Sequence, residues 1–171
     1  SLSGQASRPG PLRIAVPVDS RLSIDVTAAD VAVTGRVGTS ALNAGSGDVS
    51  VAAVEGDVRV SSGSGDIELG TVAGAATLRA GSGTVRVGHA GTSAHVGTGS
   101  GDVTIERADG DVLAKSGSGD LRIGRAQGSA ALSSGSGHLF VDRIGAGSLS
   151  AKTASGHVEV GVGDGVVVWL D

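Results

Sequence analysis

The amino-acid sequence predicts an all-β fold, a single-domain parallel β-solenoid (β-helix) of about eight rungs with a right-handed coil. Three observations predict it. A Gly-Ser-Gly-Asp tetrapeptide or a close variant recurs with a period of 18 residues. Apolar-x-apolar triplets follow at half that period, and glycine makes up 31 of the 171 residues. Such a repeat indicates one strand-turn-strand-turn unit, made of two 9-residue half-rungs, stacked on copies of itself.

The tetrapeptide is typical of a tight turn. It begins at Gly45, Gly63, Gly99 and Gly117, and variants begin at Gly81, Gly135 and Ala154. Successive starts lie 18 residues apart except for the last step of 19, whose extra residue falls within residues 145–147. Glycine adopts the positive φ that tight corners require. We therefore predict structural turn glycines at Gly47, Gly65, Gly83, Gly101, Gly119 and Gly137.

The triplets predict strands with one buried face, because apolar residues alternate with polar or small ones. Examples are Val49/Val51, Val58/Val60, Ile67/Leu69, Val103/Ile105 and Leu121/Ile123. A third apolar position follows in the first half-rung, for example at Val54, whereas the second half-rung has glycine at the matching place, for example at Gly63. We therefore expect one corner of the coil to be filled by side chains and the other by backbone.

The repeat divides the chain into three segments. Residues 1–19 are predicted to hold an N-terminal extra strand or cap, residues 20–164 the solenoid repeats, and residues 165–171 a terminal strand. Residues 12–18 alternate between apolar and polar but fall outside the 9-residue frame, which favours a cap over a regular rung. Because the sequence has no initiator Met and ends on a strand pattern, we expect it to be part of a longer chain.

The composition excludes several classes of partner and site. The formal net charge of −4 is spread along the chain, so no basic footprint for nucleic acid is present. Without cysteine there is no disulfide framework and no thiolate metal site. No apolar run approaches the roughly 18 residues that a membrane span needs. We expect no cofactor, and nothing in the composition selects a cell compartment.

The repeated Ser-Gly-Asp-Val/Ile/Leu-x-Val/Ile/Leu pattern resembles a bacterial adhesin family of unknown function in the β-helix class. The resemblance extends from about Ile14 onward, and the richness in Ala, Gly, Val and Arg resembles actinobacterial members. It implies a β-solenoid and an adhesin-like role. It implies no catalytic residues, because the family has no catalytic motif to transfer.

The residue after each turn glycine forms a polar column, which contains Asp48, Asp66, Thr84, Asp102, Asp120, His138 and His157. Its C-terminal part, Asp102, Asp120, His138 and His157, is the candidate metal site, because carboxylates suit Ca²⁺ and imidazoles suit transition metals. The favoured alternative is that each Asp accepts hydrogen bonds from the N–H groups of its own turn. The Asp also stands at the wrong place for the Ca²⁺-binding β-roll signature.

Two further features are candidate interaction sites. Arg107, Arg125 and Arg143 recur at rung spacing along one edge, where they could bind an acidic partner or form a solvated edge beside Glu106 and Asp142. Phe140 stands at an outward strand position and could anchor a partner or cover an apolar corner. Leu113 is predicted to be outward on the opposite face.

No catalytic template fits the sequence, and the unbroken repeat leaves no inserted loops for a cleft. The sequence therefore predicts a non-enzymatic structural or interaction module, an adhesin-like scaffold that self-associates end to end as a homo-oligomer and whose other partner is a protein or glycan. Two alternatives stay open. One is a binding module stabilised by a metal at the Asp/His column, and the other is a carbohydrate-active β-helix using Glu68, Arg86 and Arg122.

Overall fold

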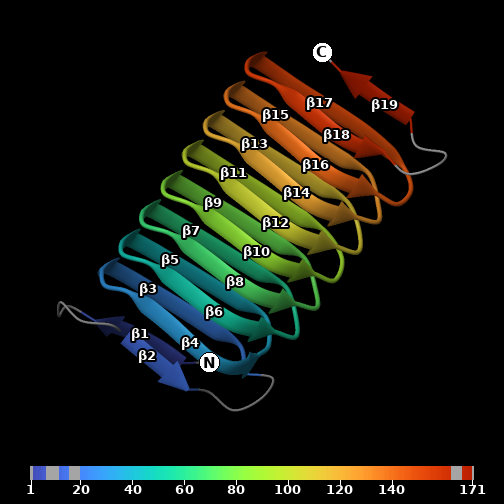
Figure 1. The fold of residues 1–171 in the computed structure, drawn as a ribbon. Coiled ribbons are helices and arrows are strands. Elements are labelled where there is room, and N and C mark those ends of the chain that lie inside the picture. Colours follow the sequence, from blue (N-terminus) through green and yellow to red (C-terminus); the bar gives the residue numbers. More distant parts are fainter. Residues whose placement is uncertain (1, 7–11, 16–19, 163–166, 171) are drawn as a thin grey trace.

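The computed structural model describes residues 2–6, 12–15, 20–162 and 167–170, and within them the chain forms strands and turns but no helix (Figure 1). The strands of the ten-stranded sheet, called sheet A, are β1 (Leu2–Ala6), β3 (Leu22–Ala28), β5 (Ser40–Ser46), β7 (Val58–Ser64), β9 (Ala76–Ser82), β11 (Ala94–Ser100), β13 (Val112–Ser118), β15 (Ala130–Ser136), β17 (Ser148–Ser155) and β19 (Val167–Leu170). The strands of the nine-stranded sheet, called sheet B, are β2 (Leu12–Ala15), β4 (Val31–Val37), β6 (Val49–Val54), β8 (Ile67–Val72), β10 (Val85–Ala90), β12 (Val103–Ala108), β14 (Leu121–Ala126), β16 (Leu139–Ile144) and β18 (Val158–Val162).

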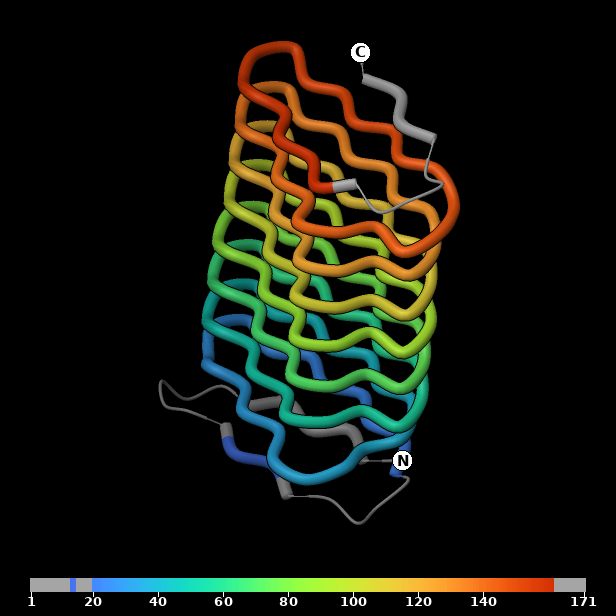
Figure 2. The backbone as a smooth tube through the Cα atoms, turned by 45° about the vertical axis from the view of Figure 1, so that its right-hand side comes forward, coloured from blue at the N-terminus to red at the C-terminus, as the bar shows by residue number. Residues whose placement is uncertain are grey.

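The chain alternates between the two sheets, so that each strand of sheet A and the following strand of sheet B make one rung. Eight rungs run from β3/β4 to β17/β18, and every strand pairs in parallel with its equivalent in the next rung. The register is 18 residues, as in Val85↔Val103 and Val103↔Leu121. Figure 2 shows the resulting flattened coil. The predicted all-β parallel solenoid is confirmed, whereas its handedness stays a prediction.

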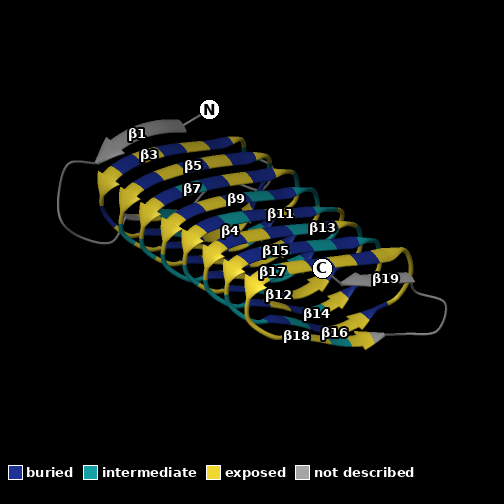
Figure 3. Ribbon diagram, turned by 90° about the horizontal axis from the view of Figure 1, so that it is seen from above, coloured by how far each residue is buried: buried dark blue, intermediate teal, exposed yellow. Residues whose placement is uncertain are grey.

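The hydrophobic core lies between the two sheets, and its residues recur as columns down the stack (Figure 3). In β8, Ile67, Leu69 and Val72 point inward, and the two residues before Val72 both face out. This pair of outward residues bends the strand toward the next corner. Val54, the predicted third apolar position, is 2% exposed. Each inward side chain stacks on its equivalent one rung away, so the buried Val, Leu, Ile and Ala residues form continuous columns through the thin core.

The second corner differs from the prediction. Sheet A strands also point a third residue inward, and in the central rungs that residue is Ser62, Ala80, Thr98, Ser116 or Ser134. Gly63 itself is exposed. The corner is therefore filled by short side chains rather than by backbone, because strand alternation continues for one more inward residue before the chain turns.

The turn glycines have the predicted conformation, with φ values between +118° and +152° at Gly47, Gly65, Gly83, Gly101, Gly119 and Gly137. Close approach adds a second requirement at the preceding glycine of each tetrapeptide. A Cβ atom placed on Gly117 would lie 2.5 Å from the carbonyl oxygen of Gly99 in the rung below. Stacked turns thus need glycine for both backbone conformation and space.

Both sheets continue at the N-terminal end of the rod, and sheet A continues at the C-terminal end. β1 pairs with β3, β2 pairs with β4, and β19 pairs with β17. Residues 12–15 of the predicted N-terminal extra strand thus lie beside the first rung, while residues 16–19 fall outside the described residues. The 19-residue step appears between β15 and β17, where Ala130 pairs with Leu149. No helix in the described part of the chain could span a membrane.

Candidate functional site

The surface of the rod has three regions that could carry function. The Asp edge is the corner between sheet A and sheet B, and it holds the predicted polar column. The outer face of sheet B holds the predicted arginines and Phe140. The outer face of sheet A, called the cationic face below, holds Arg59, Arg79, His95, Lys115 and Lys152.

On the Asp edge the carboxylates bind backbone, but in a different turn from the one predicted. Asp102 Oδ1 accepts a hydrogen bond of 2.9 Å from the amide of Asp120, and Asp120 Oδ1 accepts one of 2.7 Å from the amide of His138. Asp48 and Asp66 are joined in the same way over 2.9 Å. The amide after each turn glycine faces the preceding rung, so the acceptor lies one rung away rather than in its own turn. The column therefore links rungs.

The two histidines extend this column. The amide of His157 donates to His138 Nδ1 over 3.1 Å, and the two rings stack with centroids 5.2 Å apart and an angle of 4°. In this arrangement Nδ1 of His138 acts as the hydrogen-bond acceptor. No group of three or more His, Asp or Glu side chains suited to a metal ion occurs among the described residues. Metal binding by Asp102, Asp120, His138 and His157 stays a prediction.

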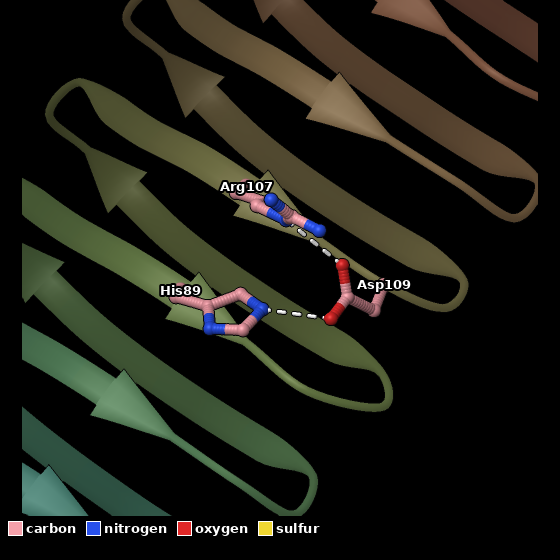
Figure 4. Close-up of polar contacts among 3 residues, drawn as sticks. All are labelled: His89, Arg107 and Asp109. Atoms are coloured by element: carbon pink, nitrogen blue, oxygen red, sulfur yellow. Dashed lines mark hydrogen bonds and ion pairs between the residues drawn. The ribbon is translucent and has the colours of Figure 1, made fainter.

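The three predicted arginines form a register column on sheet B, where Arg107 pairs with Arg125 and Arg125 with Arg143. Arg107 does not stand alone. Its Nε donates to Asp109 Oδ1 over 2.9 Å, and the Nε2 of His89 lies 2.9 Å from Asp109 Oδ2 (Figure 4). These hydrogen bonds, first from His89 and then from Arg107, lower the pKa of Asp109.

The partner of Arg107 is thus Asp109 rather than the predicted neighbour Glu106, because the turn after β12 brings Asp109 back over the column. Arg125 and Arg143 are exposed and form no ion pair within the described part of the chain. The column therefore has one neutralised and two available cations.

Phe140 is half-buried on the outer face of sheet B, beside charges of both signs. The guanidinium carbon of Arg122 lies 6.0 Å from the ring centroid, and an Arg122 nitrogen lies 3.7 Å from Asp142 Oδ1. Glu159 pairs in register on the other side of Phe140. Since these charges face each other, this part of sheet B is largely neutralised internally.

The cationic face of sheet A has a single sign of charge. From β5 to β17, the strands of sheet A contain no Asp or Glu, and their outward positions carry four cations, Arg59, Arg79, Lys115 and Lys152, together with His95. These residues belong to no motif and were not predicted as a site. They can be found by comparing outward residues that lie 18 positions apart in the sequence. Residues at that spacing belong to the same register column, and this face has two such columns.

The basic side chains of this face alternate between those two columns. One column runs Arg59, Thr77, His95 and Leu113, and the other runs Ser61, Arg79, Gly97 and Lys115. Of these four consecutive rungs, three therefore present an Arg or Lys and one presents His95. A shallow hollow with a volume of about 270 Å³ lies at Gly97 between Arg79 and Lys115, with Thr77, His95 and Leu113 of the neighbouring column along one side. Leu113 is outward and half-buried, as predicted.

Comparison with known proteins identifies the domain but not its role. The family model described as Toastrack DUF4097 matches residues 12–164, which covers nearly the whole rod. Searches of curated proteins and of solved structures found no match. The family is one of unknown function, so the adhesin-like role implied by the sequence pattern stays a prediction. The repeat, the two parallel sheets and this match agree, and the chain belongs to the Toastrack DUF4097 family.

Proposed function

We propose that this Toastrack domain is a non-enzymatic interaction module that binds an anionic partner on its cationic face. The single observation that carries the proposal is the separation of charge on a molecule whose net charge is −4. Sheet A presents cations without acids from β5 to β17, whereas the outer face of sheet B mixes both signs. A one-signed patch on a rigid surface steers and orients a partner of opposite charge.

The regular register supports a scaffold rather than an enzyme. Pairing offsets stay at 18 residues from β5 to β15 in sheet A, so no loop is inserted between those rungs. Enzymes usually gather catalytic groups in a concave pocket. Here the side chains that differ from rung to rung lie on open faces, where they can contact an extended partner.

The test uses a cation-exchange resin at pH 7 in low salt. A protein with a net charge of −4 binds such a resin only through a local cationic patch. The variant Arg59→Ser/Arg79→Ser/Lys115→Ser removes three cations from sheet A, and Arg86→Ser/Arg125→Ser/Arg143→Ser removes three from sheet B. We expect the wild type and the sheet B variant to be retained and the sheet A variant to flow through. Equal elution of the two variants, or no retention of the wild type, would overturn the proposal.

A second proposal concerns self-association. Among the described residues, β18 is the last strand of sheet B and pairs on one edge only, with β16. An open strand edge is a template for another chain. We propose that a second copy stacks on this edge and lengthens the rod.

Sedimentation velocity over a range of concentrations tests the stacking. We expect species that grow in steps of one rod and that persist in 0.5 M NaCl, because strand pairing does not depend on exposed charges. A single monomer at every concentration, with isolated short rods in electron micrographs, would refute it.

A further inference from the structure

We propose that the hollow at Gly97, called the Gly97 notch, holds one segment of a linear carboxylated polysaccharide that lies along the rod. This inference rests on the proposed function, since it names the class of anionic partner for the cationic face. Its occupant is a polymer whose chain runs across the strands from rung to rung. The spacing of the cations, the shape of the notch and the side chains around it point to this class of polymer.

The spacing follows from the register. Arg79, Gly97 and Lys115 are consecutive partners in β9, β11 and β13, so their outward positions form one line along the rod. Ser133 and Lys152 continue that line in β15 and β17. Cations thus alternate with small residues, and neighbouring cations are two strand spacings apart, about 9.6 Å. The partner should therefore present like negative charges at a regular repeat with uncharged material between them.

The shape of the notch shows where that uncharged material fits. A Cβ atom placed on Gly97 would have no other atom within 4 Å, so the space above this glycine is open. The volume of about 270 Å³ lies just below the range typical of pockets that enclose a small molecule. Because the notch is also shallow, it suits one unit of a longer chain better than a ligand that must be buried on all sides.

The chemistry of the surrounding side chains matches a sugar acid. Arg79 can hold a carboxylate with two parallel hydrogen bonds, and Lys115 can hold the next as a point charge. Thr77 and His95 offer hydrogen-bonding groups to sugar hydroxyls, while Leu113 offers apolar contact to the C–H face of a ring. In β-1,4-linked polyuronates successive sugars face opposite sides, so carboxylates on one side recur at every second sugar. That pattern corresponds to a cation, a glycine and a cation in three successive rungs.

A nucleic acid fits this face less well. Proteins that bind single strands without sequence preference stack the bases on aromatic rings. The outward positions of sheet A from β5 to β17 carry no aromatic ring other than the imidazole of His95, and Phe140 lies on sheet B. The cationic face provides charge, hydroxyls and one apolar side chain instead, which is the set that a polyuronate requires.

The test is isothermal titration calorimetry of the full chain with three probes: an oligomannuronate, a neutral β-1,4-mannan oligomer of equal length, and linear polyphosphate. The deciding variant is Gly97→Val, which fills the notch but keeps every charge. It should fold, because its Cβ meets open space and β-branched residues suit strands. Ala41→Val, at an outward position of β5 on the same face, is the matched control.

We expect the oligomannuronate to bind, the neutral oligomer not to bind, and Gly97→Val to weaken oligomannuronate binding at least about tenfold. Ala41→Val should bind as the wild type does, and Gly97→Val should still be retained on the cation-exchange resin. Polyphosphate binding as tight as that of the oligomannuronate, and unaffected by Gly97→Val, would overturn the notch while leaving the cationic face in place. Absence of oligomannuronate binding by a wild type that the resin retains would do the same.

Discussion

The Asp edge contains one natural gap, and filling it should stabilise the domain. Thr84 stands in the column between Asp66 and Asp102. The amide of Thr84 donates to Asp66 Oδ1 over 2.7 Å, but no side-chain hydrogen bond joins Thr84 to the amide of Asp102 in the described part of the chain. Thr84→Asn would supply the missing acceptor at the geometry used by Asp102 for Asp120. Thr84→Asp would supply the same acceptor with a negative charge.

The free energies of hydrogen bonding and of charge repulsion distinguish the two variants. A neutral hydrogen bond contributes about 0.5–1.5 kcal/mol net, and one to a charged group about 1.5–3 kcal/mol. The carboxylate of Thr84→Asp would stand one rung, about 4.8 Å, from each of Asp66 and Asp102. Two unit charges at that distance repel by about 1 kcal/mol in water. The repulsion from two neighbours therefore cancels most of the gain in low salt, whereas Asn keeps its full contribution.

Thermal unfolding followed by circular dichroism at 20 mM and 500 mM NaCl would measure both effects. For a chain of this length, 1 kcal/mol corresponds to about 2–4 °C in Tm. We expect Thr84→Asn to raise Tm by about that amount at both salt concentrations. Thr84→Asp should change Tm little at 20 mM and raise it at 500 mM, where charges are screened. A Thr84→Asn variant no more stable than the wild type would refute the inter-rung role of this column.

Three further predictions concern stability. The pKa of Asp109 is lowered in the folded state, so its contribution is present at pH 7 and is lost as the pH falls through that lowered pKa, below about 4; urea midpoints should show Asp109→Asn less stable than the wild type at pH 7, by a margin that shrinks at pH 3, with Asp142→Asn as control. Gly101→Ala should lower the free energy of unfolding by about 1–3 kcal/mol, because Gly101 has a φ of +152° and its new Cβ would collide with the carbonyl of Gly83. Gly97→Ala should not destabilise, because the space above Gly97 is open. Equal urea midpoints for these two alanine variants would contradict this. Thr98→Val should stabilise by about 1 kcal/mol in thermal unfolding, since the buried Thr98 Oγ1 has no hydrogen-bond partner among the described residues. Ser116→Ala, which removes a 3.4 Å hydrogen bond to the carbonyl of Gly101, should not stabilise.

The rung could be predicted from sequence because its determinants are periodic. Inward residues such as Ile67 and Leu69, and turn glycines such as Gly101, recur at fixed positions, and each position has one physical requirement: burial or positive φ. The same period placed Arg107, Arg125 and Arg143 in one column.

Contacts between rungs were harder to predict, because they depend on the direction in which a side chain or a backbone amide points, and not only on its position in the repeat. Asp102 was expected to bind its own turn, but the free amide that it binds belongs to the next rung. Arg107 pairs with Asp109 because the corner folds back, which spacing alone does not indicate. The cationic face was not predicted because Arg59 and Arg79 occupy different columns, so its cations do not recur every 18 residues as the turn motif does.

The 18-residue register also gives the domain a mechanical character. Hydrogen bonds between rungs point along the rod, so a force that pulls its ends apart loads the terminal rung first and detaches rungs in order. An 18-residue rung that occupies about 4.8 Å of the rod would extend to about 60 Å once released. Each detachment therefore lengthens the released 18-residue segment more than tenfold, while the remaining rungs keep their pairing. Under tension the rod would therefore extend in equal steps, one rung at a time.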